Sequence, residues 1–554
     1  MRVCWSGSFF SNASLAIVNR RLVRALLDRG KVEVAVSGEP VHPDVLMPEF
    51  RSLAEHASFG PDEADITVLH NFPPQFAVPS RSRYVHIQPW EYGSMPREWY
   101  DALHDECDDI WAHANLNRDA YIEDGIDPAR VAVIPHGVDL ATFSPDGPKM
   151  ATTPAGFRFL FFGGTLDRKG IDALLNAYHR AFRRSDDVVL MIKDVNPQTL
   201  YRDSNRRDEI LRLTQRVDMP RIEYTDGTFP DVAMAQLYRA ADCFVLPYRG
   251  EGFGMPVLEA MACGRPVIVT AGGATDDFVD ETVGWRIPST RQNVNVVETV
   301  RQAWLLNPDV DALAASMRFA FEHRDEARRR GEVAAARART WTWDRTAAIV
   351  EERLAHIMSR APMPAVRRAE RYRDPSFCAE QIFGDSRLDG IVLQVFRRLG
   401  VGRACFVELT EDNAIAAAPV LARGMRWTGI AIERRAGAAP ERHRFYENSP
   451  QTQLLFEDFT AATLPATLRA RGVEPELDLL SLGCPDAADA YDVLTGFRPR
   501  VIACAASVIR DVERRAGSAY ARAACESERG ETLLVREDLA DRAGFTPTPA
   551  TMRS

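Results

Sequence analysis

Short apolar runs alternate with longer amphipathic stretches along the first part of the chain. Residues 2–7 (RVCWSG) predict a buried strand ending at Gly7, and residues 12–30 show the pattern of an amphipathic helix that Gly30 would close. Further apolar runs follow at residues 32–38, 64–74, 83–93, 108–115 and 130–139. Strands that alternate with helices indicate a parallel α/β sheet, in which ligands bind beyond the carboxyl ends of the strands.

The same alternation begins again after Ser144–Gly156, a segment rich in proline, glycine and small polar residues that we interpret as a linker. Its helices extend to about Ile357. A second linker is expected at Ala361–Ser376, and the region beyond it again mixes strands and helices. The strands of the second alternation are predicted at residues 157–164, 187–194, 221–227, 243–248, 266–270 and 284–288.

These boundaries predict three domains. Residues 1–149 would form an N-terminal Rossmann-like domain, and residues 150–360 a second Rossmann-like domain whose final helix packs back on the first. Residues 377–545 would form a C-terminal α/β domain.

Composition and charge narrow the classes of function. The 554 residues are 46% hydrophobic and 26% charged, which is ordinary for a soluble globular protein, and the formal net charge of −10 argues against general nucleic-acid binding. The nine cysteines are scattered and never spaced as CxxC, so we expect reduced thiols. No apolar run approaches the roughly 18 residues of a membrane span. We therefore expect a cytoplasmic protein, which would associate peripherally with a membrane if its acceptor is a lipid.

The strongest chemical signal lies between Tyr248 and Ala271 (YRGEGFGMPVLEAMACGRPVIVTA). Pro256 suits the first position of a helix, which places Glu259 one turn inside it. The preceding Gly252 and Gly254 would let backbone N–H groups approach an anion at the helix N-terminus, while a carboxylate beside it could accept hydrogen bonds from hydroxyl groups. A loop with two solvated glutamates, Glu251 and Glu259, is the alternative.

A second strand–glycine–helix pattern lies in FRFLFFGGTLDRKGIDALLNAY. The strand ends at Gly163 and Gly164, the loop carries Arg168 and Lys169, and Gly170 opens a helix, which is typical of a phosphate cradle. The chain has only four lysines, Lys31, Lys149, Lys169 and Lys193, so a lysine in a glycine loop is informative. An ordinary surface lysine is the alternative for Lys169, and Lys193, at a strand end, is the next candidate.

Residues 1–360 resemble the retaining glycosyltransferases of family four, which have the GT-B architecture of two Rossmann-like domains facing a cleft. The resemblance rests on four segments: GGTLDRKG, YRAADCFVLPYRGEGFGMPVLEAMACGRPVI, VIPHGVDLATFSP and WTWDRTAAIVEERL. It implies a nucleotide-sugar donor and an unidentified glycan, lipid-linked or protein acceptor, with retention of anomeric configuration.

The resemblance also implies roles for individual residues. The donor pyrophosphate would meet Lys169 and the backbone around Gly252, Phe253 and Gly254, while Glu259 would bind the ribose and Glu251 the donor sugar. Gly7 and Gly164 would belong to the glycine loops of the two domains. The family often has an arginine directly after the glycine that corresponds to Gly164. This chain has Thr165 there, and Arg168 is the candidate substitute.

Many relatives carry a histidine that meets the donor sugar, and His86 and His70 are both candidates for it. His86 lies inside a strand-like run, so a core histidine is an equal interpretation. Trp90 and Glu91, in the segment IQPWEYGSMPREW, would shape the acceptor side, although an interface tryptophan is equally expected.

The implied chemistry needs little from the protein beyond charge. Lys169, Arg168 and helix N-termini would neutralise the leaving nucleoside diphosphate, and the leaving phosphate itself would take the acceptor proton. No cofactor and no metal ion are expected. The literal DxD at Asp309–Asp311 precedes a helix, so helix capping explains it better than metal binding.

Residues 377–545 faintly resemble FkbM-type methyltransferases, through FVELTEDN, MRWTGIAIE and LDLLSLGCPDAADAYDVLTGFRPRVI. Glu433 would then face the ribose of S-adenosylmethionine. The turn expected directly after Glu408 holds Leu409, Thr410 and Glu411 where that family has glycine, and β-carbons there would block the cofactor. We therefore expect an inactive structural or docking domain.

Two other functions stay open from the sequence. One is a bifunctional glycosyltransferase and S-adenosylmethionine-dependent methyltransferase. The other is a non-catalytic scaffold on the same architecture, against which the presence of Glu251, Glu259 and Lys169 argues.

Overall fold

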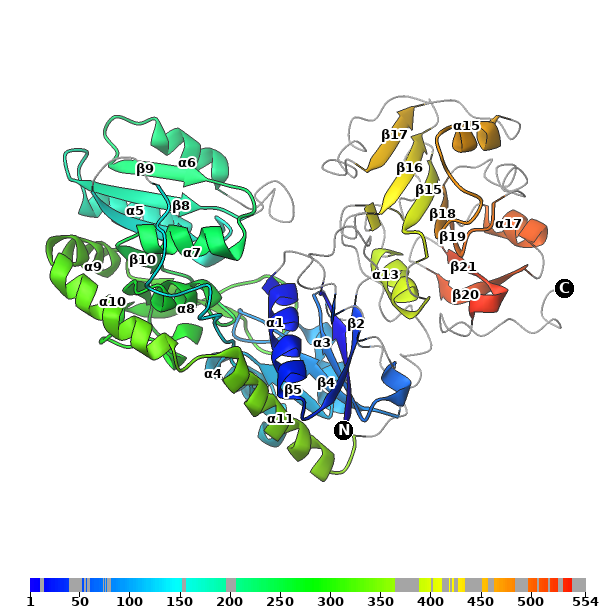
Figure 1. The fold of residues 1–554 in the computed structure, drawn as a ribbon, viewed down its shortest axis with the longest axis horizontal. Helices are drawn as coiled ribbons and strands as arrows, with labels where there is room; N and C mark the ends of the chain where they lie inside the picture. Colours follow the sequence, from blue (N-terminus) through cyan, green and yellow to red (C-terminus); the bar gives the residue numbers. More distant parts are fainter. Residues whose placement is uncertain are drawn as a thin grey trace. The chain divides into compact units, whose positions relative to one another are not determined.

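The computed structural model divides the chain into two compact units (Figure 1). One unit contains residues 1–27, 32–85 and 362–554, and the other contains residues 28–31 and 86–361. The residues that the structure describes are 1–9, 14–38, 52–53, 56, 60–72, 74, 76, 81–151, 156–195, 206–363, 388–399, 402–410, 418, 421–422, 427–433, 451–456, 463–483, 497–505, 508–516, 519–526 and 532–540.

The N-terminal part of the chain folds as alternating strands and helices. Its elements are β1 (Arg2–Gly7), α1 (Ser14–Arg29), β2 (Glu33–Gly38), η2 (Pro61–Glu63), β3 (Ile66–His70), β4 (Arg83–Ile87), α3 (Arg97–Asp105), β5 (Asp109–Ala112), α4 (Asn115–Glu123), η3 (Pro128–Arg130) and β6 (Val131–Val133). The strand order is β2-β1-β3-β4-β5-β6, and β1 pairs in parallel with both β2 and β3. Helix α1 ends at Arg29 and Gly30 has a φ of +64°, which confirms the predicted helix end.

The second sheet has the order β12-β11-β10-β7-β8-β9, and every pair in it is parallel. The predicted parallel α/β class is therefore confirmed. Its elements are β7 (Phe157–Phe162), η4 (Asp167–Lys169), α5 (Ile171–Ala181), β8 (Val188–Lys193), α6 (Arg207–Thr214), β9 (Arg221–Thr225), α7 (Asp231–Ala240), β10 (Cys243–Leu246), α8 (Met255–Ala262), β11 (Val267–Thr270), η5 (Ala274–Asp277) and β12 (Gly284–Ile287).

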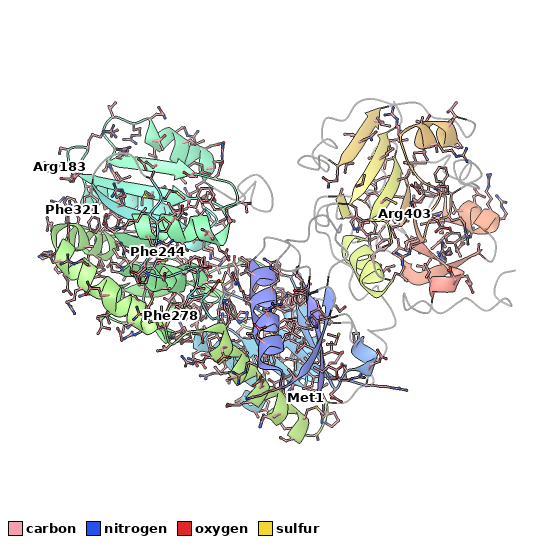
Figure 2. The ribbon with its side chains drawn as sticks, in the orientation of Figure 1. Met1, Arg183, Phe244, Phe278, Phe321 and Arg403 are labelled. Atoms are coloured by element: carbon pink, nitrogen blue, oxygen red, sulfur yellow. The ribbon has the colours of Figure 1, made fainter. Side chains whose placement is uncertain are left out.

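The core of this sheet explains why its strands read as unbroken apolar runs. All four residues of β10 and all four of β11 are buried, as expected of parallel strands covered by helices on both faces. Phe244 lies on β10 within this core (Figure 2). The ring of Phe321, near the end of the helix Val310–Glu322, packs edge-on against Phe157 and Phe182. The strand ends are thereby held rigidly, and the loops that follow them start from fixed points.

A hairpin and three helices follow β12: β13 (Ser289–Asn293), β14 (Trp304–Pro308), α9 (Val310–Glu322), α10 (Arg324–Ala338) and α11 (Trp343–Ser359). Strands β13 and β14 are antiparallel, and the sequence patterns did not predict them. The carboxylate of Asp309 accepts hydrogen bonds from the backbone N–H groups of Asp311 and Ala312 at the start of α9. This confirms the helix-capping interpretation of the DxD.

Helix α11 contacts residues from the N-terminal part of the chain. Arg353 donates to both carboxylate oxygens of Asp109, at 2.9 and 2.6 Å. Arg29 donates to both carboxylate oxygens of Glu351, each at 2.9 Å. Both are two-point contacts between a guanidinium and a carboxylate, which are among the stronger ion pairs.

The C-terminal region contains a mixed sheet of order β17-β16-β15-β18-β19-β21-β20, in which β21 runs antiparallel to both neighbours. Its two faces cover separate apolar clusters, with Phe406 in one and Val407 in the other. The elements are α13 (Leu388–Leu399), β15 (Cys405–Thr410), β16 (Thr428–Glu433), β17 (Thr452–Phe456), α15 (Leu464–Ala470), β18 (Leu479–Gly483), β19 (Val501–Cys504), α17 (Ile509–Ala516), β20 (Tyr520–Glu526), β21 (Thr532–Arg536) and η10 (Glu537–Leu539).

The sequence analysis predicted a turn directly after Glu408, and this position is wrong. Leu409 and Thr410 still pair with β16 and β18, so the strand continues to Thr410. Both therefore have extended backbone within a sheet, where a β-carbon carries no penalty. Glu411 and the rest of the predicted turn lie outside the described residues.

Candidate active site

The first candidate loop connects β7 to α5. Asp167–Lys169 form a single 3₁₀ turn, and Gly170 then takes a φ of +73° at the start of α5. A β-carbon on Gly170 would lie 1.9 Å from the carbonyl oxygen of Pro247, so only glycine fits between the two loops. This close approach holds Lys169 at the N-terminal end of α5.

The second candidate loop connects β10 to α8. The helix begins at Met255, so Pro256 is its second residue and not its first as predicted; Pro at either position leaves the helix intact. Gly254 precedes the helix with a φ of +95°. Glu251 lies in the loop itself, with only 9% of the residue exposed.

The two loops are joined by several hydrogen bonds. The carbonyl of Arg168 accepts a hydrogen bond from the N–H of Arg249 at 2.7 Å, and the Arg168 guanidinium donates to the carbonyl of Gly250 at 2.8 Å. The guanidinium of Arg249 donates to both carboxylate oxygens of Asp172, at 2.6 and 2.8 Å. The sequence patterns missed this last pair, although Asp172 stands in the first turn of the helix that Lys169 precedes.

Lys169 and Glu251 meet where the loops join. The Lys169 ammonium donates a hydrogen bond to the Glu251 carboxylate. Burial alone would raise the pKa of Glu251, but the charges of Lys169 and Arg168 outweigh it and lower that pKa below its ordinary value. The structure thus brings together three predicted site residues, Arg168, Lys169 and Glu251, and keeps Glu251 ionised.

Glu259 lies one turn inside α8, half-buried, as predicted. One of its carboxylate oxygens accepts a hydrogen bond from the hydroxyl of Tyr238 at 2.9 Å. Burial, together with the charge of Glu259, raises the pKa of Tyr238 well above its ordinary value. Tyr238 was not singled out from the sequence, although it opens one of the diagnostic segments.

Gly164, Gly252 and Phe253 differ in what they offer a ligand. The carbonyl of Gly164 accepts the N–H of Leu166 at 2.8 Å. A β-carbon on Gly252 would make only an ordinary contact with Pro89. The ring of Phe253 is buried against His136 and Phe278, at centroid distances of 4.5 and 5.1 Å, so a ligand contact from Phe253 would have to come from its backbone.

The side chains of Thr165 and Lys193 both form hydrogen bonds with residues of the second sheet and its loops. The N–H and hydroxyl of Thr165 donate to the carboxylate of Asp194, at 3.1 and 2.8 Å. Lys193 is 2% exposed and donates to the carbonyls of Asp194 and Gly227, and burial lowers its pKa. Lys193 is therefore an internal structural lysine in this conformation.

The candidate residues of the N-terminal part divide between the two units. In the first unit, Gly7 ends β1 opposite His70, and a ring nitrogen of His70 lies 2.8 Å from the side-chain oxygen of Asn19. In the second unit, His86 is fully buried within β4, 3.0 Å from the side-chain oxygen of Gln88. Burial lowers the pKa of His86 to about 4, so its imidazole is neutral near pH 7. The assignment of either histidine to the donor sugar stays a prediction.

The described ranges show neither a metal-ligating cluster nor a membrane-spanning helix. These ranges contain no cluster of three or more His, Cys, Asp or Glu side chains suited to a metal ion. None of their helices is both long and apolar enough to cross a bilayer. Six cysteines in the described part of the chain are free thiols: Cys4, Cys107, Cys243, Cys263, Cys405 and Cys504.

Comparison with known proteins points to the same part of the chain. Residues 156–321 match the family model described as "Glycosyl transferases group 1". A D-inositol 3-phosphate glycosyltransferase from Kineococcus radiotolerans is 34% identical over 271 residues, which cover 45% of this chain and 56% of the relative. A mannosylfructose-phosphate synthase from Agrobacterium fabrum is 27% identical, with coverage of 48% and 56%. The chain thus spans about half the length of the curated relatives it matches.

Two solved structures are also similar, at lower identity. The sucrose-phosphate synthase from Thermosynechococcus elongatus has a TM-score of 0.48 and 18% identity, covering 65% of this chain and all of its own. Anabaena HepE in complex with UDP-glucose has a TM-score of 0.47 and 14% identity, covering 64% of this chain and all of its own. The residues that match the family model, 156–321, include Lys169, Glu251 and Glu259.

Proposed function

We propose that this protein is a glycosyltransferase that moves a sugar from a nucleotide-sugar donor to a glycan, lipid-linked or protein acceptor, with retention of anomeric configuration. The observation that carries the proposal is the ion pair between Lys169 and Glu251 at the junction of two strand–glycine–helix loops. The match of this region to the glycosyltransferase model supports it, as do relatives described as glycosyltransferases.

The site offers what transfer from a nucleoside diphosphate requires. As the bond to the sugar breaks, negative charge grows on the leaving diphosphate, and the ammonium of Lys169 with the N-terminal N–H groups of α5 and α8 would stabilise it. Glu251, once released from Lys169, would accept hydrogen bonds from donor-sugar hydroxyls, and Glu259 from the ribose. The leaving phosphate would take the acceptor proton, so the protein needs no general base.

We also propose that the reaction needs no metal and that the protein acts in the cytoplasm. Free, buried cysteines support a reducing compartment.

We expect full activity in excess EDTA, because protein cations would neutralise the charge of the leaving diphosphate. The check is the transfer rate in EDTA with and without added Mg²⁺ or Mn²⁺; loss that either ion restores would contradict the metal-free mechanism.

The strand order of the C-terminal domain supports a second candidate function. Its sheet places the first strand, β15, between β16 and β18, the arrangement that creates a ligand crevice in Rossmann-like sheets. This supports the alternative of a bifunctional enzyme that also binds S-adenosylmethionine. We favour a docking or stabilising domain, because the sequence that follows β15, Glu411–Asn413, contains no glycine.

A panel of nucleotide sugars tests the proposal directly. The full-length protein is screened by thermal shift against UDP-, GDP- and ADP-linked sugars and the free diphosphates, and donors that bind are then assayed for slow hydrolysis. We expect one nucleotide to raise the unfolding temperature and its sugar to be hydrolysed. Binding without hydrolysis or transfer to any acceptor would favour the scaffold alternative.

A further inference from the structure

Arg168 is engaged from two sides. Its guanidinium donates to the carbonyl of Gly250 and forms an ion pair with the carboxylate of Glu91, at 3.0 Å. The side chains of Arg168 and Glu91 are only 17% and 21% exposed, so water screens this pair far less than a surface pair. Arg168 thus links the loop after β10 to the segment after β4.

The segment that carries Glu91 is itself held in place by hydrogen bonds. The indole N–H of Trp90 donates to the carbonyl of Ser94 at 2.5 Å, and the side chain of Asn117 donates to the carbonyl of Trp90 at 2.6 Å. The hydroxyl of Tyr121 donates to the carbonyl of Gln88 at 2.6 Å. Glu91 therefore reaches Arg168 from an anchored backbone, and the pair has a defined geometry.

The β13–β14 hairpin binds both sides of this link. The N–H of Trp304 donates to the carbonyl of Tyr92 at 2.9 Å, and the N–H of Leu306 donates to the carbonyl of Arg249 at 2.8 Å. One hairpin strand thus bonds the residue after Glu91 and the residue before Gly250.

The turn of the hairpin adds an ion pair between the partly exposed Arg301 and a buried carboxylate of the same segment. The Arg301 guanidinium donates to the carboxylate of Asp124 at 2.9 Å, and that carboxylate also accepts the hydroxyl of Ser94. The N–H of Arg301 donates to the same Ser94 hydroxyl at 2.9 Å. The Asp124 side chain is fully buried, so this connection is costly to break.

We propose that Glu91 and Arg168 are positioning residues: their ion pair, backed by the β13–β14 hairpin, fixes the donor loops so that Lys169 meets the diphosphate and Glu251 the donor sugar in reactive geometry. This rests on the proposed function, and it gives Arg168 a different role from the direct phosphate contact expected from its sequence. Both contacts hold the Nη1 end of the guanidinium against the protein, which favours a structural role for Arg168. Lys169, next to it, is then the cation that meets the diphosphate.

The two roles for Arg168 predict opposite results when the Glu91 charge is removed. If Arg168 is a direct phosphate ligand, Glu91→Gln frees it and binding of uridine or guanosine diphosphate becomes tighter. If the pair positions the loops, Glu91→Gln leaves the Kd of the diphosphate within about threefold. It then lowers kcat by about 10- to 100-fold, because small misplacements of reacting groups cost rates of this size. Glu91→Asp should recover part of kcat by restoring the carboxylate.

The experiment measures diphosphate Kd by calorimetry and kcat for the bound donor, in full-length wild type, Glu91→Gln, Glu91→Asp and Arg168→Gln. The control is Glu223→Gln, which removes a partly buried ion pair with Arg221 on β9 and should change neither quantity more than twofold. Tighter diphosphate binding in Glu91→Gln, or an unchanged kcat, would overturn the proposal.

A double-mutant cycle on the ligand-free protein separates this proposal from the proposed function. Glu91→Gln and Arg168→Gln should each lower the unfolding temperature, and the double variant should fall no further than the larger single effect. Additive losses would show that the pair is not formed in solution and would overturn the positioning role. If the cycle shows coupling but no nucleotide binds wild type, the proposed function fails while the structural link stands.

Discussion

The second sheet and the C-terminal sheet share a central arrangement but differ at the edge where a ligand would bind. In one, β7 lies between β8 and β10; in the other, β15 lies between β16 and β18. Both arrangements create a crevice at the carboxyl ends of the strands. After β7 and β10 come glycine loops that present Lys169 and Glu251, whereas β15 ends in Thr410 and β18 in Gly483.

The acidic residues of the two edges are also used differently. Glu251 pairs with a lysine at the loop junction, where a ligand can compete for either partner. Glu408 is buried within β15 and accepts a hydrogen bond from the backbone N–H of Ala418. Topology therefore supplies a place for a ligand, and only the loop residues decide whether the place has chemistry.

The largest effect should come from removing the lysine that pairs with Glu251 at the edge of the second sheet. Lys169→Ala should lower kcat by about 10²–10³-fold with a smaller change in donor affinity, since charge on the leaving group grows in the transition state. Steady-state kinetics decide, with Lys149→Ala, an exposed lysine elsewhere, as control. A rise in KM alone would make Lys169 a uniform binder.

The next effect concerns the carboxylate inside α8. Glu259→Ala should weaken donor binding by roughly 10- to 100-fold, because a hydrogen bond to a charged group is worth about 1.5–3 kcal/mol. Tyr238→Phe removes only the hydroxyl that donates to Glu259 and should cost less. Calorimetry with the donor measures both, and an unchanged Kd in Glu259→Ala would remove the ribose assignment.

A third test compares backbone constraints in the two regions. Gly170→Ala should destabilise the fold by about 2–4 kcal/mol, because left-handed backbone strain adds to the clash with the Pro247 carbonyl. Gly472→Ala, at a similar φ of +81° in the C-terminal region but with open space around it, should cost about 1–2 kcal/mol. Denaturant unfolding of both variants gives the difference; equal losses would show that the close approach of the two loops is not maintained in solution.

The last prediction is that S-adenosylmethionine does not bind. Full-length protein titrated with S-adenosylmethionine should give no heat of binding at physiological concentrations, because the sequence after β15, Glu411–Asn413, contains no glycine that would let the cofactor approach bare backbone. Calorimetry is the measurement. Micromolar binding at one molecule per chain would reverse the contrast between the two edges and favour the bifunctional alternative.

Local patterns predicted much of the fold. The strands around Phe159, Phe244 and Ile268 are continuous apolar runs, and Gly30 and Asp309 end or cap helices through their own backbone or side chain, so sequence alone locates them. The β13–β14 hairpin was missed because its first strand, STRQN, is polar and exposed. Its place is set by hydrogen bonds to distant residues, which no local pattern contains.

The candidate site likewise contains residues that local patterns identify and contacts that they do not. Lys169, Glu251 and Glu259 stand in glycine-rich loops and a helix start, which are recognisable in sequence. Lys193 was the next candidate after Lys169, at a strand end, and its burial shows it to be an internal lysine. The ion pair between Arg168 and Glu91 joins segments far apart in the chain, so its existence could only be found in three dimensions.

Under the proposed function, the pairing of Lys169 with Glu251 would make donor binding an exchange of ionic partners. The incoming diphosphate replaces one anion at the lysine, and the freed carboxylate must gain hydroxyl donors from the sugar to offset its lost partner. A nucleoside diphosphate without a sugar supplies the first contact and omits the second. On this proposal, selectivity for the intact donor over the spent nucleotide would follow from the pairing of the two residues, and product inhibition should be correspondingly weak.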